Sequence, residues 1–179
     1  MTSGRRPDGP ATVSIAPVRT TGELALAIAL FQDYAASLDV DLRLQGFDVE
    51  LASMPGDYAP PRGELLLVQG PDGAGLGCIG LRPLSAGVCE IKRLYVRPQA
   101  RGSDHGKALI GAIIATAQAL GYDQAVLDTL PSMTAAIRLY RSLGFEPIPP
   151  YRVGAFPELM YFGRALRDPP SPSSVQGRH

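Results

Sequence analysis

The sequence predicts a mixed α/β domain with an antiparallel first half and helices that flank a central mixed sheet. Three observations favour this class. Short apolar runs bounded by turn residues recur in the first half, helix and strand patterns alternate in the second half, and a glycine-containing turn joins one strand directly to a helix. The chain of 179 residues is long enough for one domain with a substantial core, and 45% of its residues are hydrophobic.

We expect three regions along the chain. Residues 1–11 are polar and contain proline and glycine, which predicts a flexible N-terminal segment. The folded domain is expected over residues 12–167. Prolines and serines are frequent in residues 168–179, which predicts a disordered C-terminal tail.

The first half of the domain is expected to hold a strand, two helices and three further strands, in this order: 12–18, 21–38, 47–53, 64–69, 75–82 and 88–96. Pro17 marks the end of the first strand, and Thr20 or Thr21 is suited to cap the first helix. Prolines and glycines in residues 54–63 predict a loop, and residues 83–87 predict the hairpin turn between the last two of these strands.

The second half holds the clearer helical patterns. We expect a helix, a strand, a helix and a last strand: 106–120, 124–129, 134–143 and 158–166. Gly121 and Gly144 are suited to end the two helices, because glycine adopts the left-handed backbone found there. A proline-rich segment, residues 147–150, precedes the last strand.

Charge and cysteine content narrow the classes of partner. The formal net charge is +0, which argues against nucleic acid or an anionic membrane, because binding to phosphate groups normally shows as a basic excess. The longest apolar run, residues 24–30, is too short to span a bilayer, and no targeting segment is visible. Cys78 and Cys89 fall in predicted strands, so we expect both to be buried as small hydrophobic residues of a protein in a reducing compartment. We therefore expect a cytoplasmic protein.

The most informative segment is the turn between the strand that ends at Val96 and the helix that follows it. Such a turn aims backbone N–H groups and the positive end of a helix dipole at one point, where a phosphate or pyrophosphate binds. Arg97, Arg101 and Lys107 add positive charge, and Asp104 is the only acid in the turn. Asp tolerates a left-handed backbone better than most residues, so we expect the turn to keep its shape. The alternative is an ordinary loop with Asp104 as a helix cap.

The order of elements and two motifs resemble the GNAT superfamily of acyl-CoA N-acyltransferases. Residues 101–106, Arg-Gly-Ser-Asp-His-Gly, resemble the family's Gln/Arg-x-x-Gly-x-Gly/Ala turn, with Asp104 where a glycine is usual. The later pattern Ala-x-x-Leu-Tyr-x-x-x-Gly-Phe is matched by residues 136–145, while Met133 stands where the family often has asparagine. The resemblance covers about residues 13–166 and implies the GNAT fold with acetyl-CoA, or a close acyl-CoA, as donor.

By this resemblance, acetyl-CoA is held by the turn and by the strand before it. The pyrophosphate is expected on the N–H groups from Gly102 to Lys107. The pantetheine arm is expected to pair with the backbone of Leu94 and Val96, where the strand splays from its neighbour. The residues expected to bind acetyl-CoA are Leu94, Tyr95, Val96, Arg101, Gly102, Ser103, Asp104, His105, Gly106, Lys107 and Met133. No metal is expected.

Two residues are candidates for acid–base chemistry. The resemblance implies a carboxylate base on the strand before the turn, which is Glu90 here, and a tyrosine acid facing the CoA sulfur, which is Tyr140. If no bulge intervenes, strand alternation places Glu90 on the same side as Lys92, Leu94 and Val96. The alternatives are a glutamate that only pairs with a neighbouring cation and a tyrosine that only packs on the core.

The acceptor is the least defined part of the prediction. The resemblance places acceptor contacts in the first two helices and in the loop before the last strand, where we expect Tyr34, Tyr58 and Tyr151 to bind the substrate. These residues suit the primary amine of a small or amino-acid-like molecule. The sequence is also compatible with a homodimer. One alternative is a protein N-terminal or lysine acetyltransferase. The other is a non-catalytic acyl-CoA-binding or sensor domain, which the presence of both Glu90 and Tyr140 argues against.

Overall fold

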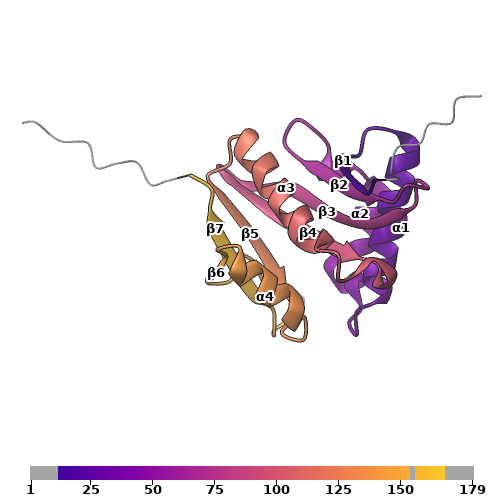
Figure 1. The fold of residues 1–179 in the computed structure, drawn as a ribbon. Helices are drawn as coiled ribbons and strands as arrows, with labels where there is room; N and C mark the ends of the chain where they lie inside the picture. Colours follow the sequence, from indigo (N-terminus) through magenta and orange to yellow (C-terminus); the bar gives the residue numbers. More distant parts are fainter. Residues whose placement is uncertain (1–11, 154–155, 168–179) are drawn as a thin grey trace, which may run out of the picture.

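The computed structural model describes residues 12–153 and 156–167 and contains a seven-stranded sheet with helices on both faces (Figure 1). The strands are β1 (Ser14–Pro17), β2 (Glu64–Gln69), β3 (Gly75–Ser85), β4 (Val88–Val96), β5 (Gln124–Thr129), β6 (Glu146–Pro147) and β7 (Met160–Ala165). The α-helices are α1 (Thr21–Ala36), α2 (Phe47–Ser53), α3 (His105–Ala119) and α4 (Thr134–Ser142), and short 3-10 turns lie at Leu42–Gln45, Gly56–Tyr58 and Pro98–Ala100. The two terminal segments predicted to be flexible, residues 1–11 and 168–179, lie outside the described residues.

The order of the strands across the sheet is β1-β2-β3-β4-β5-β7-β6. Strands β1 to β4 form an antiparallel meander, and β4 pairs with β5 in parallel. A parallel pair needs a long crossover, and α3 supplies it between these two strands. Strand β7 then pairs antiparallel with both β5 and β6. The predicted mixed sheet with an antiparallel first half is confirmed.

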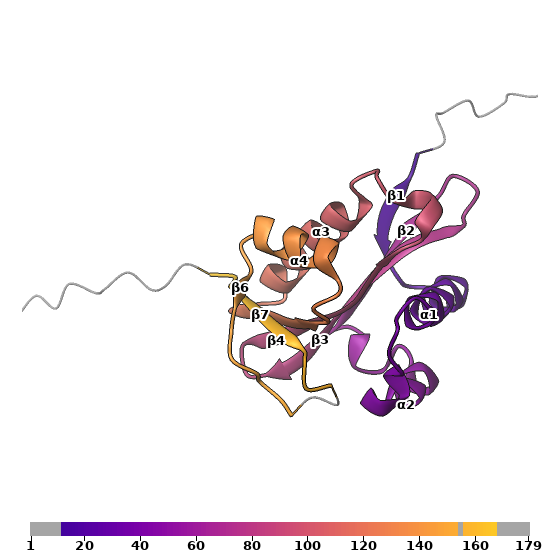
Figure 2. The same ribbon diagram turned by 90° about the horizontal axis from the view of Figure 1, so that it is seen from below.

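Helices α3 and α4 cover one face of the sheet, and α1 and α2 cover the other (Figure 2). The buried apolar residues therefore form two cores, one on each side of the sheet. The α3–α4 core contains Ile110 and Ile113, and the α1–α2 core contains Leu30 and Phe31. Because buried apolar surface stabilises by roughly 25 cal/mol per Å², these two cores hold the helices on the sheet.

Both cysteines lie in the cores, on opposite sides of the sheet. Cys78 packs in the α1–α2 core and Cys89 in the α3–α4 core, and each is 0% exposed. Burial raises the pKa of both thiols, which keeps them protonated. The prediction that the cysteines act as small buried hydrophobes is confirmed.

Local sequence signals set most of the helix ends. Thr20 caps α1 through a capping box, in which the Glu23 N–H donates to the Thr20 hydroxyl and the Thr20 N–H donates to the Glu23 carboxylate. Gly121 and Gly144 have φ of 87° and 82°, as expected for residues that end helices. No helix in the described part of the chain is long and apolar enough to cross a membrane.

Several element boundaries differ from the sequence prediction by one to three residues, and one short strand is not predicted. Strand β3 continues to Ser85 rather than ending at Arg82, and Pro83 is tolerated inside it beside a register irregularity with β4. The last strand begins at Met160, slightly later than predicted. The two-residue strand β6, Glu146–Pro147, is absent from the prediction because its formation depends on pairing with β7 rather than on a pattern of its own.

Candidate active site

Strands β4 and β5 diverge, and the opening between them forms the main cleft of the molecule. Their parallel pairing covers only Val88 to Glu90 on β4, opposite Gln124 to Val126 on β5. Among the described residues, the second half of β4 therefore has no strand partner on that side. A cleft of about 730 Å³ lies between β4, the turn before α3 and the start of α4. The predicted splay of β4 from its neighbour is confirmed.

The turn before α3 has the backbone shape that the sequence predicts. Gly102 has φ of 85° and Asp104 has φ of 56°, so both residues are left-handed. The Asp104 side chain makes no capping hydrogen bond to α3, which leaves the first N–H groups of this helix facing the cleft. Such a helix start suits an anion. All of the residues expected to bind acetyl-CoA line this cleft except Ser103.

The basic residues near the turn do not share one role. Arg101 and Lys107 line the cleft, whereas Arg97 is not among the lining residues and pairs with Asp33 of α1 at 2.8 Å between Nη2 and Oδ2. Arg101 donates from Nε to the carbonyl oxygen of Val96 at 2.9 Å. That carbonyl belongs to a residue expected to pair with pantetheine, and its oxygen has a second lone pair for a further hydrogen bond.

A β-bulge in β4 decides which face its side chains occupy. The register with β3 shifts there, and Arg93 has φ of 60°. As a result, Lys92 and Arg93 both point to the α1–α2 side, although they are consecutive. Leu94 and Val96 pack against the α3–α4 core instead. The prediction that Glu90 shares a face with Lys92, Leu94 and Val96 assumed that β4 has no bulge. Lys92 does lie beside Glu90, whereas Leu94 and Val96 lie on the other face because the alternation reverses at the bulge.

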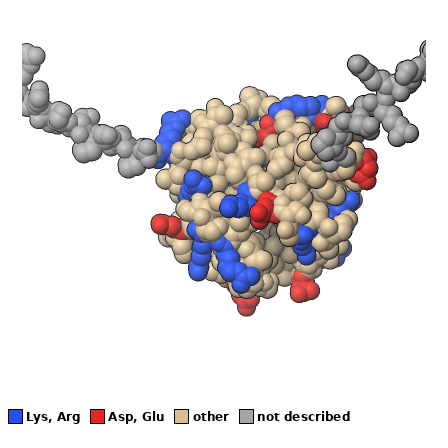
Figure 3. Space-filling view, viewed as in Figure 1, with Lys and Arg blue, Asp and Glu red and all other residues tan. Residues whose placement is uncertain are grey.

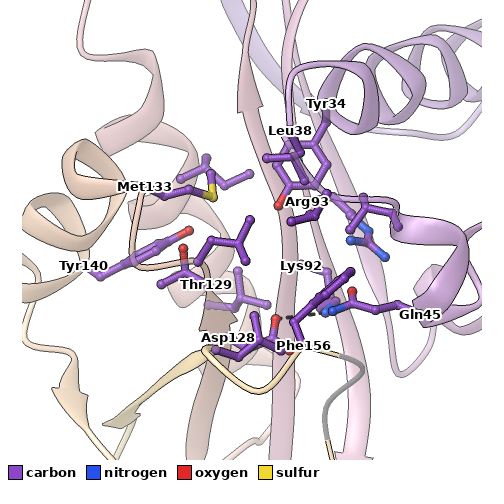
Figure 4. A pocket seen from close by; sticks show the side chains of 16 residues that line it. Tyr34, Leu38, Gln45, Lys92, Arg93, Asp128, Thr129, Met133, Tyr140 and Phe156 are labelled. Atoms are coloured by element: carbon purple, nitrogen blue, oxygen red, sulfur yellow. Dashed lines mark hydrogen bonds and ion pairs between the residues drawn. The ribbon is translucent and has the colours of Figure 1, made fainter.

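A narrow space of about 30 Å³ lies between the cleft and a second hollow and shares lining residues with both, and we call it the passage. The passage shares Tyr34, Leu94 and Met133 with the cleft and shares Lys92 and Asp128 with the second hollow. Figure 4 shows these side chains converging from β4, β5, α1 and the region of α4. The passage is therefore the place where a ligand in the cleft would meet a ligand in the hollow.

Tyr140 projects from α4 into the passage, from the side opposite Tyr34 (Figure 4). Its buried ring packs edge-on against Phe145, with 5.9 Å between the ring centroids. Within the described part of the chain the Tyr140 hydroxyl makes no hydrogen bond, and burial raises its pKa, so it stays protonated. Thr129 Oγ1, also in the passage, is likewise buried with no hydrogen-bond partner among the described residues.

The second hollow has a volume of about 380 Å³ and a charged lining. Its charged residues are Glu50, Arg82, Lys92, Arg93, Asp128 and Arg152. Arg93 makes two hydrogen bonds to Glu50, at 3.0 and 2.6 Å, and Lys92 Nζ lies 3.1 Å from Asp128 Oδ1. Burial lowers the pKa of Lys92 to about 8, and the nearby Asp128 opposes this shift.

Glu90 lies behind the second hollow rather than in its wall. Its side chain is 0% exposed and lines neither the cleft, the passage nor the hollow. It accepts hydrogen bonds from Arg82 Nε and from the Tyr151 hydroxyl, each at 2.9 Å, and it contacts Arg152. Lys92 Nζ lies 3.6 Å from the carboxylate. Pairing with neighbouring cations, one of the two interpretations from sequence, is thus present in the structure.

The three tyrosines expected at the acceptor have different surroundings. Tyr34 lines both the cleft and the passage. Tyr151 reaches Glu90 behind the hollow. Tyr58 is buried in the α1–α2 core, where its hydroxyl donates to Glu50 Oε1 at 2.7 Å, and it lines neither the passage nor the second hollow.

Asp128 is one of the residues of this site that the sequence analysis does not single out. It lies near the end of β5 and lines both the passage and the second hollow. A usable signal exists, because a carboxylate within a buried apolar strand is rare unless it is paired or functional. Pattern alone does not separate it from Glu90, since both are acids inside predicted strands.

Outside the cleft, Lys and Arg side chains gather over α4 on the face drawn in Figure 3. This helix carries Arg138 and Arg141, both exposed. Neither of them lines the cleft, so they are surface charges in this structure. Acidic residues are also visible on the same face, which therefore carries charges of both signs.

Known proteins share both the sequence pattern and the fold. A match to the Acetyltransferase (GNAT) family covers residues 35–145. An uncharacterized N-acetyltransferase of Schizosaccharomyces pombe is 39% identical over 153 residues, which are 85% of this chain and 94% of that protein. A GNAT-family acetyltransferase structure from Staphylococcus aureus Mu50 aligns with a TM-score of 0.74 and 20% identity, over 87% of this chain and 100% of that one. The structure of YncA from Salmonella typhimurium with its cofactor acetyl-CoA aligns with a TM-score of 0.63 and 19% identity, over 92% and 99%. The resemblance seen in the sequence is confirmed, and the chain belongs to the GNAT family of acetyltransferases.

Proposed function

We propose that this protein transfers an acetyl group from acetyl-CoA to the primary amine of a small or amino-acid-like molecule by direct attack. The observation that carries this proposal is a pair of cavities that both share lining residues with the passage, into which Tyr140 projects. The larger cleft ends at the start of α3 and suits a phosphorylated donor. The second hollow is charged and suits a polar acceptor. Membership of the GNAT family supports acetyl transfer as the reaction.

The cleft offers acetyl-CoA a contact for each of its parts. The left-handed turn at Gly102 and Asp104 leaves N–H groups of α3 for the pyrophosphate, and Lys107 adds a positive charge. The unpaired side of β4 offers strand-like partners for the pantetheine arm. Met133 lines both the cleft and the passage, where the thioester would end. The relative YncA, which shares the fold, was solved with acetyl-CoA.

The reaction forms one C–N bond and breaks one C–S bond. The neutral amine attacks the carbonyl carbon of the thioester, and the electrons of the C–S bond leave with the CoA sulfur. The amine gives one proton to a base, and the sulfur takes one proton from Tyr140, so that an amide and a free thiol are formed. Exchange with solvent then returns the proton from the base to Tyr140. The Tyr140 side chain is buried and its hydroxyl makes no hydrogen bond within the described residues, which supports this role.

We propose Asp128 as the first candidate for the base and Glu90 as the second. Asp128 lines the passage together with Tyr140, so it can contact the amine directly. Glu90, which the family resemblance favours, lies behind the hollow and reaches the acceptor through Lys92, whose Nζ is 3.6 Å from Glu90 and 3.1 Å from Asp128. The two candidates can be told apart by mutation, because only the variant of the true base should lose the acidic limb of the profile of kcat/KM against pH.

Thiol release in the presence of acetyl-CoA and a panel of primary amines tests the proposed activity, with mass spectrometry to identify the acetylated product. We expect thiol release that requires an amine. Binding of acetyl-CoA by calorimetry without turnover of any amine would favour the non-catalytic sensor instead. A strong preference for peptides with free N-termini or lysines over small amines would favour a protein acetyltransferase.

The charge at Arg101 gives a direct test of the donor site. Arg101→Glu places a carboxylate beside the phosphates, so we expect it to weaken acetyl-CoA binding by roughly tenfold or more, measured by calorimetry. The matched control is Arg138→Glu, the same charge reversal at an exposed position outside the cleft.

Asp104→Gly should leave the affinity for acetyl-CoA unchanged or improve it, because glycine adopts a positive φ without strain and the substitution removes a negative charge. Equal affinity of the wild type and Arg101→Glu would contradict this assignment of the turn.

A further inference from the structure

We propose that the acceptor carries a carboxylate in addition to its amine, and that Arg82 and Arg152 bind this carboxylate in the second hollow. The inference deepens the proposed function and rests on it. Four cationic and two acidic side chains line the hollow: Arg82, Lys92, Arg93, Arg152, Glu50 and Asp128.

Two of the four cations have a carboxylate each. Arg93 binds both oxygens of Glu50, with Nε to Oε1 at 3.0 Å and Nη2 to Oε2 at 2.6 Å. Lys92 pairs with Asp128 at 3.1 Å. Arg82 and Arg152 are the other two cations of the lining, and Asp128 is shared, since its Oδ2 also lies 3.3 Å from Arg152 Nη2.

Arg82 and Arg152 share one carboxylate, Glu90, which is fully buried behind them. Arg82 uses Nε for this contact, at 2.9 Å, and no other side-chain hydrogen bond of Arg82 is formed within the described residues. Arg152 reaches Glu90 through Nη2, while its Nε is buried with no partner in the described part of the chain. With Glu90 included, the four cations face three carboxylates, Glu50, Glu90 and Asp128, which leaves one positive charge in excess and unused N–H donors on the two guanidinium groups.

The electrostatics of Arg152 agree with an excess of positive charge at this place. Burial lowers the pKa of Arg152, and repulsion from Arg82 lowers it further. A second anion beside the two guanidinium groups would relieve that repulsion. Guanidinium groups bind carboxylates through paired hydrogen bonds, which makes a carboxylate of the ligand the fitting anion.

The position of the two arginines also places the amine. Arg82 and Arg152 keep 23% and 31% of their side chains exposed, so both can be reached from the hollow. Arg152 Nη2 lies 3.3 Å from Asp128 Oδ2, and Asp128 lines the passage as well as the hollow. An acceptor held through its carboxylate at Arg152 therefore keeps its amine close to Asp128 and to the end of the passage. An amino acid meets this requirement, whereas a simple alkylamine does not.

The test compares acceptors that differ only in the carboxylate. Thiol release is measured for a set of amino acids, for the corresponding amino acid amides and for the corresponding decarboxylated amines. We expect the wild type to prefer the amino acids by roughly tenfold or more in kcat/KM, since a charge-assisted hydrogen-bond pair at a partly buried site is lost in the amides. Arg82→Gln and Arg152→Gln should remove this preference while leaving the KM for acetyl-CoA unchanged. Arg167→Gln, at an exposed arginine that pairs with Asp123, is the matched control and should keep the preference.

The outcomes separate this inference from the proposed function. Equal kcat/KM of the wild type for amino acids and their amides would overturn the inference and leave acetyl transfer standing. If no amine supports thiol release, calorimetry of the same amino acids and amides in the presence of CoA still decides the inference, because tighter binding of amino acids supports it and equal binding overturns it. Because the acceptor comparison uses the wild-type protein, a folding defect in an arginine variant does not affect it.

Discussion

Replacement of Tyr140 by phenylalanine is expected to lower kcat roughly 10²- to 10³-fold, which is the usual range for a positioned acid. The phenylalanine keeps the ring packed against Phe145 and removes only the hydroxyl that lines the passage. Because that hydroxyl has no hydrogen bond within the described residues, its loss should leave the melting temperature and the acetyl-CoA affinity close to those of the wild type. Steady-state thiol release, thermal melts and calorimetry measure these three quantities.

Tyr122→Phe is the matched control for this experiment. Tyr122 is also buried, but its hydroxyl donates to the carbonyl oxygen of Arg62 at 2.7 Å, outside the cavities of the site. We expect this control to lose about 1 kcal/mol of stability and to keep its turnover. If Tyr140 serves only to pack the core, the result changes: Tyr140→Phe keeps full activity, while Tyr140→Ala destabilises the fold by about 3–5 kcal/mol.

Asp128→Asn is expected to lower kcat/KM roughly 10²-fold and to remove or shift the acidic limb of the pH–rate profile, with little change in acetyl-CoA affinity. The reason is that Asp128 is the carboxylate that lines both the passage and the second hollow. Asp123→Asn is the matched control, because Asp123 lies just before the same strand, is 61% exposed and pairs with Arg167.

Glu90→Gln separates the two candidate bases. If Asp128 is the base, Glu90→Gln retains the acidic limb of the profile and mainly loses stability, by about 3–5 kcal/mol, because one partner of a buried ion cluster has been neutralised. If Glu90 is the base, its variant loses the acidic limb while Asp128→Asn retains it. Profiles of kcat/KM against pH on both variants, with thermal melts beside them, give the answer.

The donor side of the site is the part that sequence predicts best. The turn depends on the backbone preferences of residues that are close together in the chain. Gly102 and Asp104 both adopt the left-handed conformation that the sequence favours. The splay of β4 also follows from the family resemblance, and the pairing with β5 ends at Glu90. Nearly every residue expected to bind acetyl-CoA lines the cleft for these reasons.

The second hollow, which we propose as the acceptor site, is the part that sequence predicts least well. Its charged residues come from α2, β3, β4, β5 and the loop before β7, which only the folded chain brings together. Tyr58 illustrates the difficulty, because the sequence suggests direct contact with the acceptor, whereas in the fold its ring packs in the α1–α2 core and its hydroxyl donates to Glu50 of the hollow. Asp128 illustrates the converse, because nothing in its neighbours along the chain distinguishes it from any other acid in a strand.

By itself, the sequence of this protein determines the mixed α/β class, the order of its main elements, its family and the left-handed turn before α3. These features depend on periodicity and on local φ preferences, which act between residues close in the chain. The tertiary structure alone decides which charges meet in the second hollow and which side of the sheet Glu90 occupies. The physical reason is the β-bulge at Arg93, since one extra residue reverses the alternation of β4 and its position depends on the register with β3.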